Sequence, residues 1–155
     1  MSLELEIPFE TEEGYQYLVS FREFPINQLN YGIPLVDVSI TLMSSAPEIN
    51  SLKTLNNFIK IVLLYLEQNN VIIYYYCDTA PIKIRTTRTK KYTNQEYRFY
   101  LFLMMFNKQK SDDFYLQDII INDTINGNHY TSLISKTINA EKVQKIKVEI
   151  EKYNK

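Results

Sequence analysis

The chain has 155 residues, of which 45% are hydrophobic and 23% charged, and its net charge is -1 at neutral pH. This size and composition predict one folded domain over residues 1–155 and exclude a disordered chain. The single cysteine excludes a disulfide framework and a multi-cysteine metal site. The N-terminus lacks the basic and apolar regions of a signal peptide, and no uncharged run has membrane-spanning length, so we predict a cytoplasmic protein without membrane contact.

The first part of the chain predicts three strands. Apolar and polar residues alternate over residues 3–9, 15–21 and 36–42, which is the pattern of strands with one buried face. A turn near Gly14 makes the first two segments a hairpin. Two prolines and a glycine between residues 24 and 34 predict a loop before the third strand.

A helix and a central strand follow. Asn50 or Ser51 can cap the start of the helix. Its apolar residues recur at steps of three and four, which places them on one helical face; they are Leu52, Leu55, Ile59, Val62 and Leu66. The continuous apolar run Val71–Cys77 is rich in β-branched and aromatic residues, so it predicts a strand in the interior of the sheet.

An aromatic segment over residues 97–106 predicts the second helix, with a strand as the alternative. Thr93 and Glu96 have the spacing of a capping box before it. The segment is apolar everywhere except at Arg98, and it carries five aromatic rings; they are Tyr97, Phe99, Tyr100, Phe102 and Phe106. Such a helix is either part of the core or, where one face is exposed, a protein-binding patch.

The last part of the chain predicts a hairpin and a terminal helix. Asn126-Gly127 is the sequence typical of a two-residue turn, here between strands over residues 114–125 and 128–136. Apolar residues at helical spacing follow, and Asn139 is the expected N-cap of that helix.

The predicted element order is therefore βββαβαββα, which defines an α+β fold. Because the strands cluster along the chain, we predict a mixed or mostly antiparallel sheet with helices mainly on one face.

The charges are distributed unevenly, and a basic segment stands out. Residues 1–50 carry eight acidic side chains and one basic side chain, whereas residues 51–155 carry ten acidic and sixteen basic ones. The basic segment over residues 83–98 contains Lys83, Arg85, Arg88, Lys90, Lys91 and Arg98. Arginine presents a planar fork suited to phosphate or carboxylate. Two interpretations stay open: an anion- or nucleic-acid-binding site, or a solvated loop that pairs with the acidic first hairpin.

Residues that could carry catalysis or bind a metal are few. Asp78 and Cys77 end the central strand, but catalysis also needs a base or an orienting partner. The one histidine, His129, falls on the predicted hairpin, where a surface position is ordinary. Asp118 and Asp123 are expected on opposite strand faces, so they predict no metal site. We predict no catalytic residue, metal or cofactor, and an enzyme that uses Asp78 is the third interpretation.

The strand that ends in Cys77-Asp78-Thr79 resembles the tyrosine-rich strand of a family of small uncharacterised bacterial proteins, chiefly from the Bacteroidota. In that family the strand ends in Cys-Asp and a hydroxyl residue. An arginine-bearing helix with a bulky aromatic end follows it, similar to residues 98–106 here. The resemblance implies this fold and a cytosolic setting, but no reaction.

These features together predict a non-enzymatic protein-interaction or regulatory module, as an accessory of a bacterial conflict or defence system. Its expected partner is another protein or a second copy of the chain. The alternative is a nucleic-acid or nucleotide-phosphate binder that uses the basic segment.

Overall fold

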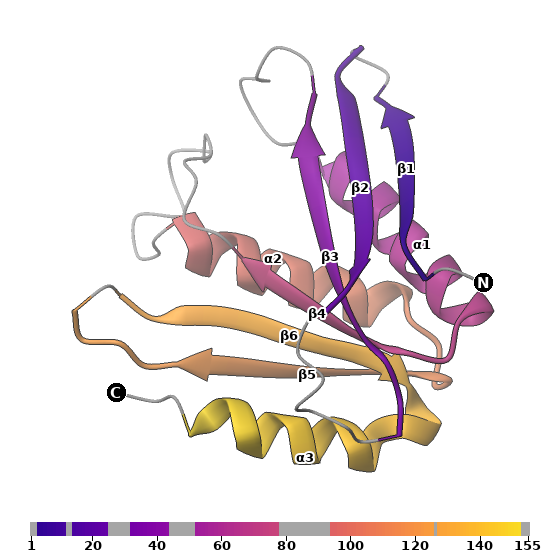
Figure 1. Ribbon diagram of the computed structural model, residues 1–155. Coiled ribbons are helices and arrows are strands. Elements are labelled where there is room, and N and C mark those ends of the chain that lie inside the picture. The colour runs from indigo at the N-terminus through magenta and orange to yellow at the C-terminus, as the bar shows by residue number, and fades with distance from the viewer. Residues whose placement is uncertain are drawn as a thin grey trace.

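The computed structural model describes residues 3–11, 14–24, 32–43, 52–77, 94–125 and 127–152. Within them six strands form one twisted sheet, and three α-helices lie against its two faces (Figure 1). The strands are β1 (Leu5–Glu10), β2 (Gln16–Glu23), β3 (Leu35–Leu42), β4 (Ile72–Cys77), β5 (Phe114–Ile121) and β6 (His129–Lys136). The helices are α1 (Leu52–Gln68), α2 (Asn94–Gln109) and α3 (Ala140–Glu151), and a short 3-10 turn, η1 (Thr137–Asn139), precedes α3.

The sheet has the strand order β1-β2-β3-β4-β6-β5. β3 and β4 are parallel, with Val36 opposite Ile73, and the other neighbouring pairs are antiparallel. A parallel pair needs a crossover connection, and α1 lies in that connection. β4 is an interior strand between β3 and β6, as its continuous apolar sequence predicted.

The predicted α+β fold, the mixed sheet and the element order are confirmed. α1 and α2 cover one face of the sheet, and α3 packs on the other face along β5 and β6 (Figure 1). The helices therefore lie mainly on one face, with α3 as the exception. On the α3 side, Leu35 of β3 packs against the core below α3, and within the described residues no helix covers β1 and β2.

The larger core lies between the sheet and the α1–α2 layer. Ile59 and Val62 of α1 are fully buried in it, as the helical spacing of apolar residues predicted. Phe21 of β2 stacks on Tyr65 of α1 with ring centroids 3.9 Å apart. The Tyr65 hydroxyl donates a hydrogen bond to the Leu3 carbonyl at 2.7 Å, so α1 also holds the chain before β1.

A smaller core lies between α3 and the opposite face of β4, β5 and β6. Its buried members include Ile72, Ile119, Leu133, Val143 and Ile146. β6 contributes to both cores, and its residues from Tyr130 to Ser135 are buried without interruption. None of the helices within the described residues is long and apolar enough to cross a membrane.

Asn139 stands at the predicted N-cap position of α3, but its side chain makes no capping hydrogen bond. The Nδ2 group of Asn139 instead donates to Oδ1 of Asn70 at 2.8 Å. This bond joins the start of α3 to the connection between α1 and β4. Asn139 is therefore at the predicted N-cap position, but its side chain does not form the capping hydrogen bond.

The connection between β5 and β6 also differs from the predicted two-residue turn, because it spans residues 122–128. The Ile125 N–H donates to Oδ1 of Asp123 at 3.0 Å, and the Asp123 N–H donates to Oδ1 of Asn128 at 3.3 Å. These side chains take backbone amides that would otherwise continue the strand ladder. Gly127 follows with a φ of +84°, a conformation that glycine adopts without steric cost.

Candidate functional site

The predicted anion- or nucleic-acid-binding site lies almost wholly outside the described residues. Five of its side chains fall there, namely Lys83, Arg85, Arg88, Lys90 and Lys91, and so does Asp78. Arg98 belongs to α2, but its side chain is not among those described. The described chain places the two ends of this segment, at the last residue of β4 and the first residue of α2. Both interpretations of the basic segment stay predictions.

The aromatic residues of α2 divide between the core and the surface. Phe99, Phe102 and Phe106 are fully buried, because they face the sheet and α1, so for these three rings the core interpretation applies. Tyr100 is 43% exposed and Met104 is 51% exposed. The side chain of Tyr97 lies outside the described part of the chain.

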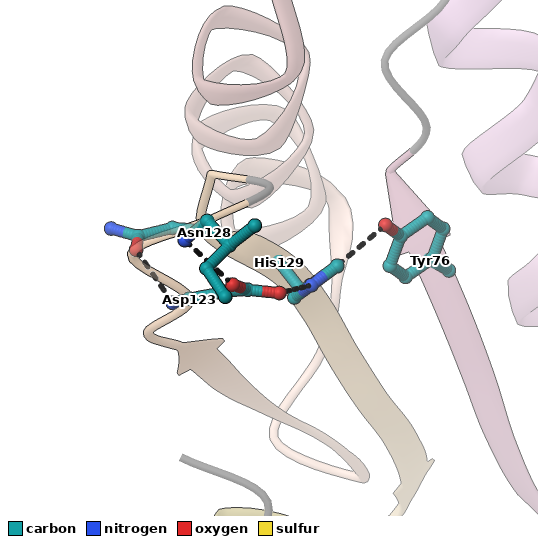
Figure 2. Close-up of polar contacts among 5 residues, drawn as sticks. Tyr76, Asp123, Asn128 and His129 are labelled. Carbon is teal, nitrogen blue, oxygen red and sulfur yellow. Dashed lines mark hydrogen bonds and ion pairs between the residues drawn. The ribbon is translucent and has the colours of Figure 1, made fainter. Parts of the chain in front are cut away.

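Three polar side chains form a chain of hydrogen bonds at one end of the sheet (Figure 2). Nε2 of His129 lies 3.1 Å from Oδ2 of Asp123, and Nδ1 of His129 lies 2.9 Å from the Tyr76 hydroxyl. The Asp123 side chain is only 3% exposed, the His129 side chain is 34% exposed, and Tyr76 is 38% exposed. We call Tyr76, His129 and Asp123 the relay.

The strand register explains why these residues meet. Tyr76 of β4 lies opposite Thr131 of β6, and His129 is two residues before Thr131, so Tyr76 and His129 are diagonal neighbours on one face. His129 also lies opposite Ile121, the last residue of β5, and Asp123 follows just beyond it. The relay therefore depends on the pairing of β4, β5 and β6.

The turn between β5 and β6 holds Asp123 in place. Its Oδ1 atom accepts the Ile125 N–H, its N–H donates to Asn128, and its carbonyl accepts the Gly127 N–H at 3.1 Å. A buried carboxylate without partners would be costly, and these bonds together with His129 offset its desolvation.

Asp123 also sets the direction of the hydrogen bonds. Oδ1 of Asp123 accepts the Ile125 N–H, and when the carboxyl is ionised its Oδ2 atom accepts from Nε2 of His129 as well. In a neutral imidazole the other nitrogen is then an acceptor, and the Tyr76 hydroxyl donates to Nδ1. The relay thus has a hydroxyl, a base and an orienting carboxylate in that order, an arrangement that can take a proton from the phenol.

The other face of β6 carries a second polar contact near the same end. Burial raises the pKa of Tyr130, and the charge of Glu96 on α2 raises it further. The side chains of Glu96 and Asn128 also hydrogen-bond Tyr130. Asn128 therefore contacts the relay through Asp123 on one side and the α2 layer through Tyr130 on the other.

Acidic side chains line the face of β1, β2 and β3 that lies on the α3 side of the sheet. Nη2 of Arg22 on β2 lies 3.0 Å from Oε1 of Glu6, and Nη1 lies 3.9 Å from Oε2 of Glu4. Arg22 also stands opposite Asp37 of β3. Glu10 continues this alternation along β1. We call Glu4, Glu6, Glu10 and Asp37 the acidic strip, and Arg22 is the only basic residue in residues 1–50.

The acidic strip reaches the relay through β4. Asp37 stands opposite Tyr74, which lies two residues before Tyr76 on the same face. Burial raises the pKa of Asp37. Burial, and after it the charges of Tyr76 and Asp37, raises the pKa of Tyr74 to about 12. The strip and the relay therefore lie on the same face of the sheet, with the partly buried Tyr74 between them.

Sequence reasoning did not identify the relay. It treated His129 as an ordinary surface residue of a hairpin, whereas the structure gives both ring nitrogens a polar partner. It considered Asp123 only as a metal ligand. The available signal was the shared strand face of Tyr76 and His129, but that signal requires the pairing of β4 with β6, which the local pattern does not specify.

Among the described residues, no group of three or more His, Cys, Asp or Glu side chains is arranged to hold a metal ion. Comparisons with known proteins supply no relative, since no family model, curated protein or solved structure matches the chain. The resemblance to the Bacteroidota family therefore stays a prediction. Any function has to be argued from the site itself.

Proposed function

We propose that this protein is a non-enzymatic interaction or regulatory module that binds a basic protein surface beside the relay. The observation that carries the proposal is the exposure of Ile125, which reaches 86% on the turn between β5 and β6. Turns normally use glycine or short polar residues, so the turn itself does not need an isoleucine. The Ile125 N–H is bonded to Asp123, which is also bonded to the half-buried His129. We call Tyr76, Ile125 and His129 the corner.

The corner is held in one geometry by hydrogen bonds. The Ile125 backbone is bonded to Asp123, and the Tyr76 hydroxyl is bonded to His129, whose ring centroid lies 6.1 Å from that of Tyr76. Ordering side chains on binding costs free energy, and a surface that is already ordered avoids part of that cost. Tyrosine is also among the residues that contribute most to interfaces. These properties support the corner as the centre of a contact surface.

The acidic strip supports a basic partner. It lies on the same face of the sheet as Tyr76 and connects to it through Tyr74. A positively charged protein surface would complement the strip, which speeds association and excludes acidic partners.

Two isoleucine variants of the full chain test the proposal. Ile138 is 83% exposed but lies in η1 at the other end of β6, so Ile138→Ser is the matched control for Ile125→Ser. We expect wild type and Ile138→Ser to capture the same basic protein from a cell lysate, and Ile125→Ser to lose it. With that protein purified, Ile125→Ser should raise Kd roughly 30-fold, which corresponds to about 2 kcal/mol.

Three results would contradict the proposal. Equal binding by all three forms would exclude the corner as the contact surface. Capture of an acidic protein would contradict the role proposed for the acidic strip. Self-association that Ile125→Ser abolishes would make a second copy the partner. Binding of DNA or RNA in a mobility shift, weakening steeply with salt and lost with Arg85→Gln plus Arg88→Gln, would favour the nucleic-acid alternative instead.

A further inference from the structure

The relay gives one tyrosine a chemical environment that the other described tyrosines lack. The chain contains a single histidine. One of its ring nitrogens is bonded to Asp123 and the other to Tyr76. Among the described tyrosines, it is therefore Tyr76 that has an imidazole nitrogen within hydrogen-bond distance of its hydroxyl. Its ring is also accessible, with 38% of its surface exposed.

We propose that Tyr76 is a nucleophile that accepts acyl groups, with His129 as its general base and Asp123 as the positioning residue. A nucleophile bonded to a base, with the base bonded to a third group, is the geometry that activates serine and cysteine nucleophiles. Here a phenol takes the place of the hydroxyl or thiol. The inference shares Tyr76 and His129 with the proposed docking surface, but it does not rest on that proposal, because its test measures the acylation of Tyr76 without any partner.

The reaction is an acyl transfer. As the Tyr76 oxygen attacks the carbonyl carbon of an activated acyl donor, its proton passes to Nδ1 of His129, and a C–O bond forms. The bond between the carbonyl carbon and the leaving group then breaks, and the leaving group departs with the electron pair and takes the proton from His129. Asp123 stabilises the imidazolium between these two transfers. The products are an O-acyl tyrosine and the free leaving group.

The local charge favours a carbonyl donor over a phosphoryl donor. The carboxylate bonded to the relay histidine is Asp123, and Asp37 lies further along the same face, opposite Arg22. Carboxylates disfavour the approach of the negatively charged oxygens that a phosphoryl donor carries. An uncharged acyl donor meets no such repulsion.

Acetylation with N-acetylimidazole, followed by mass spectrometry of the peptides, tests the inference on the full chain. Tyr100 is the internal control, since it is 43% exposed and so at least as accessible as Tyr76. We expect Tyr76 to be acetylated roughly 100-fold faster than Tyr100, the lower end of the contribution of a positioned general base. His129→Gln should reduce the Tyr76 rate to that of Tyr100, and Asp123→Asn should reduce it in part.

Two controls separate reactivity from folding. The rate at Tyr65, which is buried in the folded chain, reports whether a variant remains folded, because unfolding exposes its ring. Ile138→Ser changes an exposed isoleucine at the other end of β6, so it should leave the Tyr76 rate unchanged. The inference would be overturned if Tyr76 were acetylated no faster than Tyr100. It would also be overturned if His129→Gln left the Tyr76 rate unchanged while the Tyr100 rate stayed constant. Acetyl phosphate tests the donor class, because a phosphoryl adduct on Tyr76 would overturn the acyl assignment.

Discussion

The first and last β-hairpins of the sheet, β1–β2 and β5–β6, have turns built by the same means. In the β1–β2 hairpin, the Thr11 carbonyl accepts the Gly14 N–H at 3.0 Å, and Oγ1 of Thr11 accepts the Tyr15 N–H at 3.1 Å. In the β5–β6 hairpin, Asp123 does the same through its carbonyl and its carboxylate. Each turn is closed by one short polar side chain and a glycine with positive φ.

The hairpins differ in what the turn residue does beyond the turn. Thr11 makes only local bonds among those described, whereas Asp123 is buried and bonded to His129, which contacts Tyr76 on a third strand. A turn requires local bonds, and burying a carboxylate adds a desolvation cost. Asp123 therefore makes polar contacts in excess of those that its turn needs, which is consistent with the functional role proposed for this end of the sheet.

The largest expected difference between the hairpins lies in their apolar side chains. Ile119 of β5 is 2% exposed, and Leu5 of β1 is 45% exposed. Ile119→Ala should lower the free energy of unfolding by about 2–5 kcal/mol, because it leaves a cavity against α3. Leu5→Ala should cost less than about 1 kcal/mol. Urea unfolding of both variants measures the difference, and equal costs would show that the two hairpins contribute alike to stability.

The turn residues themselves should differ by a smaller amount. Asp123→Ala removes an ionised acceptor from His129 and from the Ile125 amide, and it should lower the free energy of unfolding by about 2–3 kcal/mol. Thr11→Ala loses one neutral hydrogen bond and should cost about 1 kcal/mol. Thermal and urea unfolding check both values. A cost for Asp123→Ala no greater than that for Thr11→Ala would mean that the relay adds nothing to the turn.

The smallest expected effect concerns pH and the acidic strip beside the first hairpin. Burial raises the pKa of the Asp37 carboxyl in the folded state. The folded state therefore binds the proton of this carboxyl more tightly than the unfolded state does. This stabilising contribution is complete below the ordinary value of 3.8 and is lost as the pH rises through the raised pKa. Asp37→Asn should therefore increase the free energy of unfolding at pH 7, and the gain should vanish in acid.

Thr41→Ala is the control for that experiment, since it is an uncharged change at an exposed position of the same strand. Urea unfolding at pH 7 and at pH 3 gives the comparison. A gain for Asp37→Asn that is the same at both pH values would show that burial of the carboxylate is not its cause.

Local sequence pattern was sufficient for most of the fold. The spacing of Ile59 and Val62 predicted a buried helical face, and the apolar run before Cys77 predicted an interior strand, because both signals come from neighbouring residues. The long β5–β6 connection was not predicted, since Asn126-Gly127 is typical of a tight turn and the competing bonds of Asp123 have no local signature. The prediction that the helices lie mainly on one face holds for α1 and α2, but no pattern specifies which face of a sheet a terminal helix such as α3 covers.

The relay was beyond prediction for a related reason. Tyr76 and His129 are 53 positions apart in the chain, and only the β4–β6 register makes them neighbours. For α2, the sequence identified the aromatic residues of the partner-binding prediction. It did not specify how the helix is rotated against the sheet, and that rotation decides that Phe99 is buried and Tyr100 is exposed.

The relay also has a consequence for the order in which the protein folds. Asp123 and His129 are 6 positions apart, so they can pair as soon as the β5–β6 hairpin forms, an event of roughly microseconds. The bond from Tyr76 has to wait until β4 pairs with β6, and pairing of such distant segments is slow because of the entropy of closing the loop. The chain has no tryptophan. The difference in tyrosine fluorescence between wild type and Tyr76→Phe during refolding therefore isolates the Tyr76 phenol among the 13 tyrosines and times the step that joins the last hairpin to the rest of the sheet.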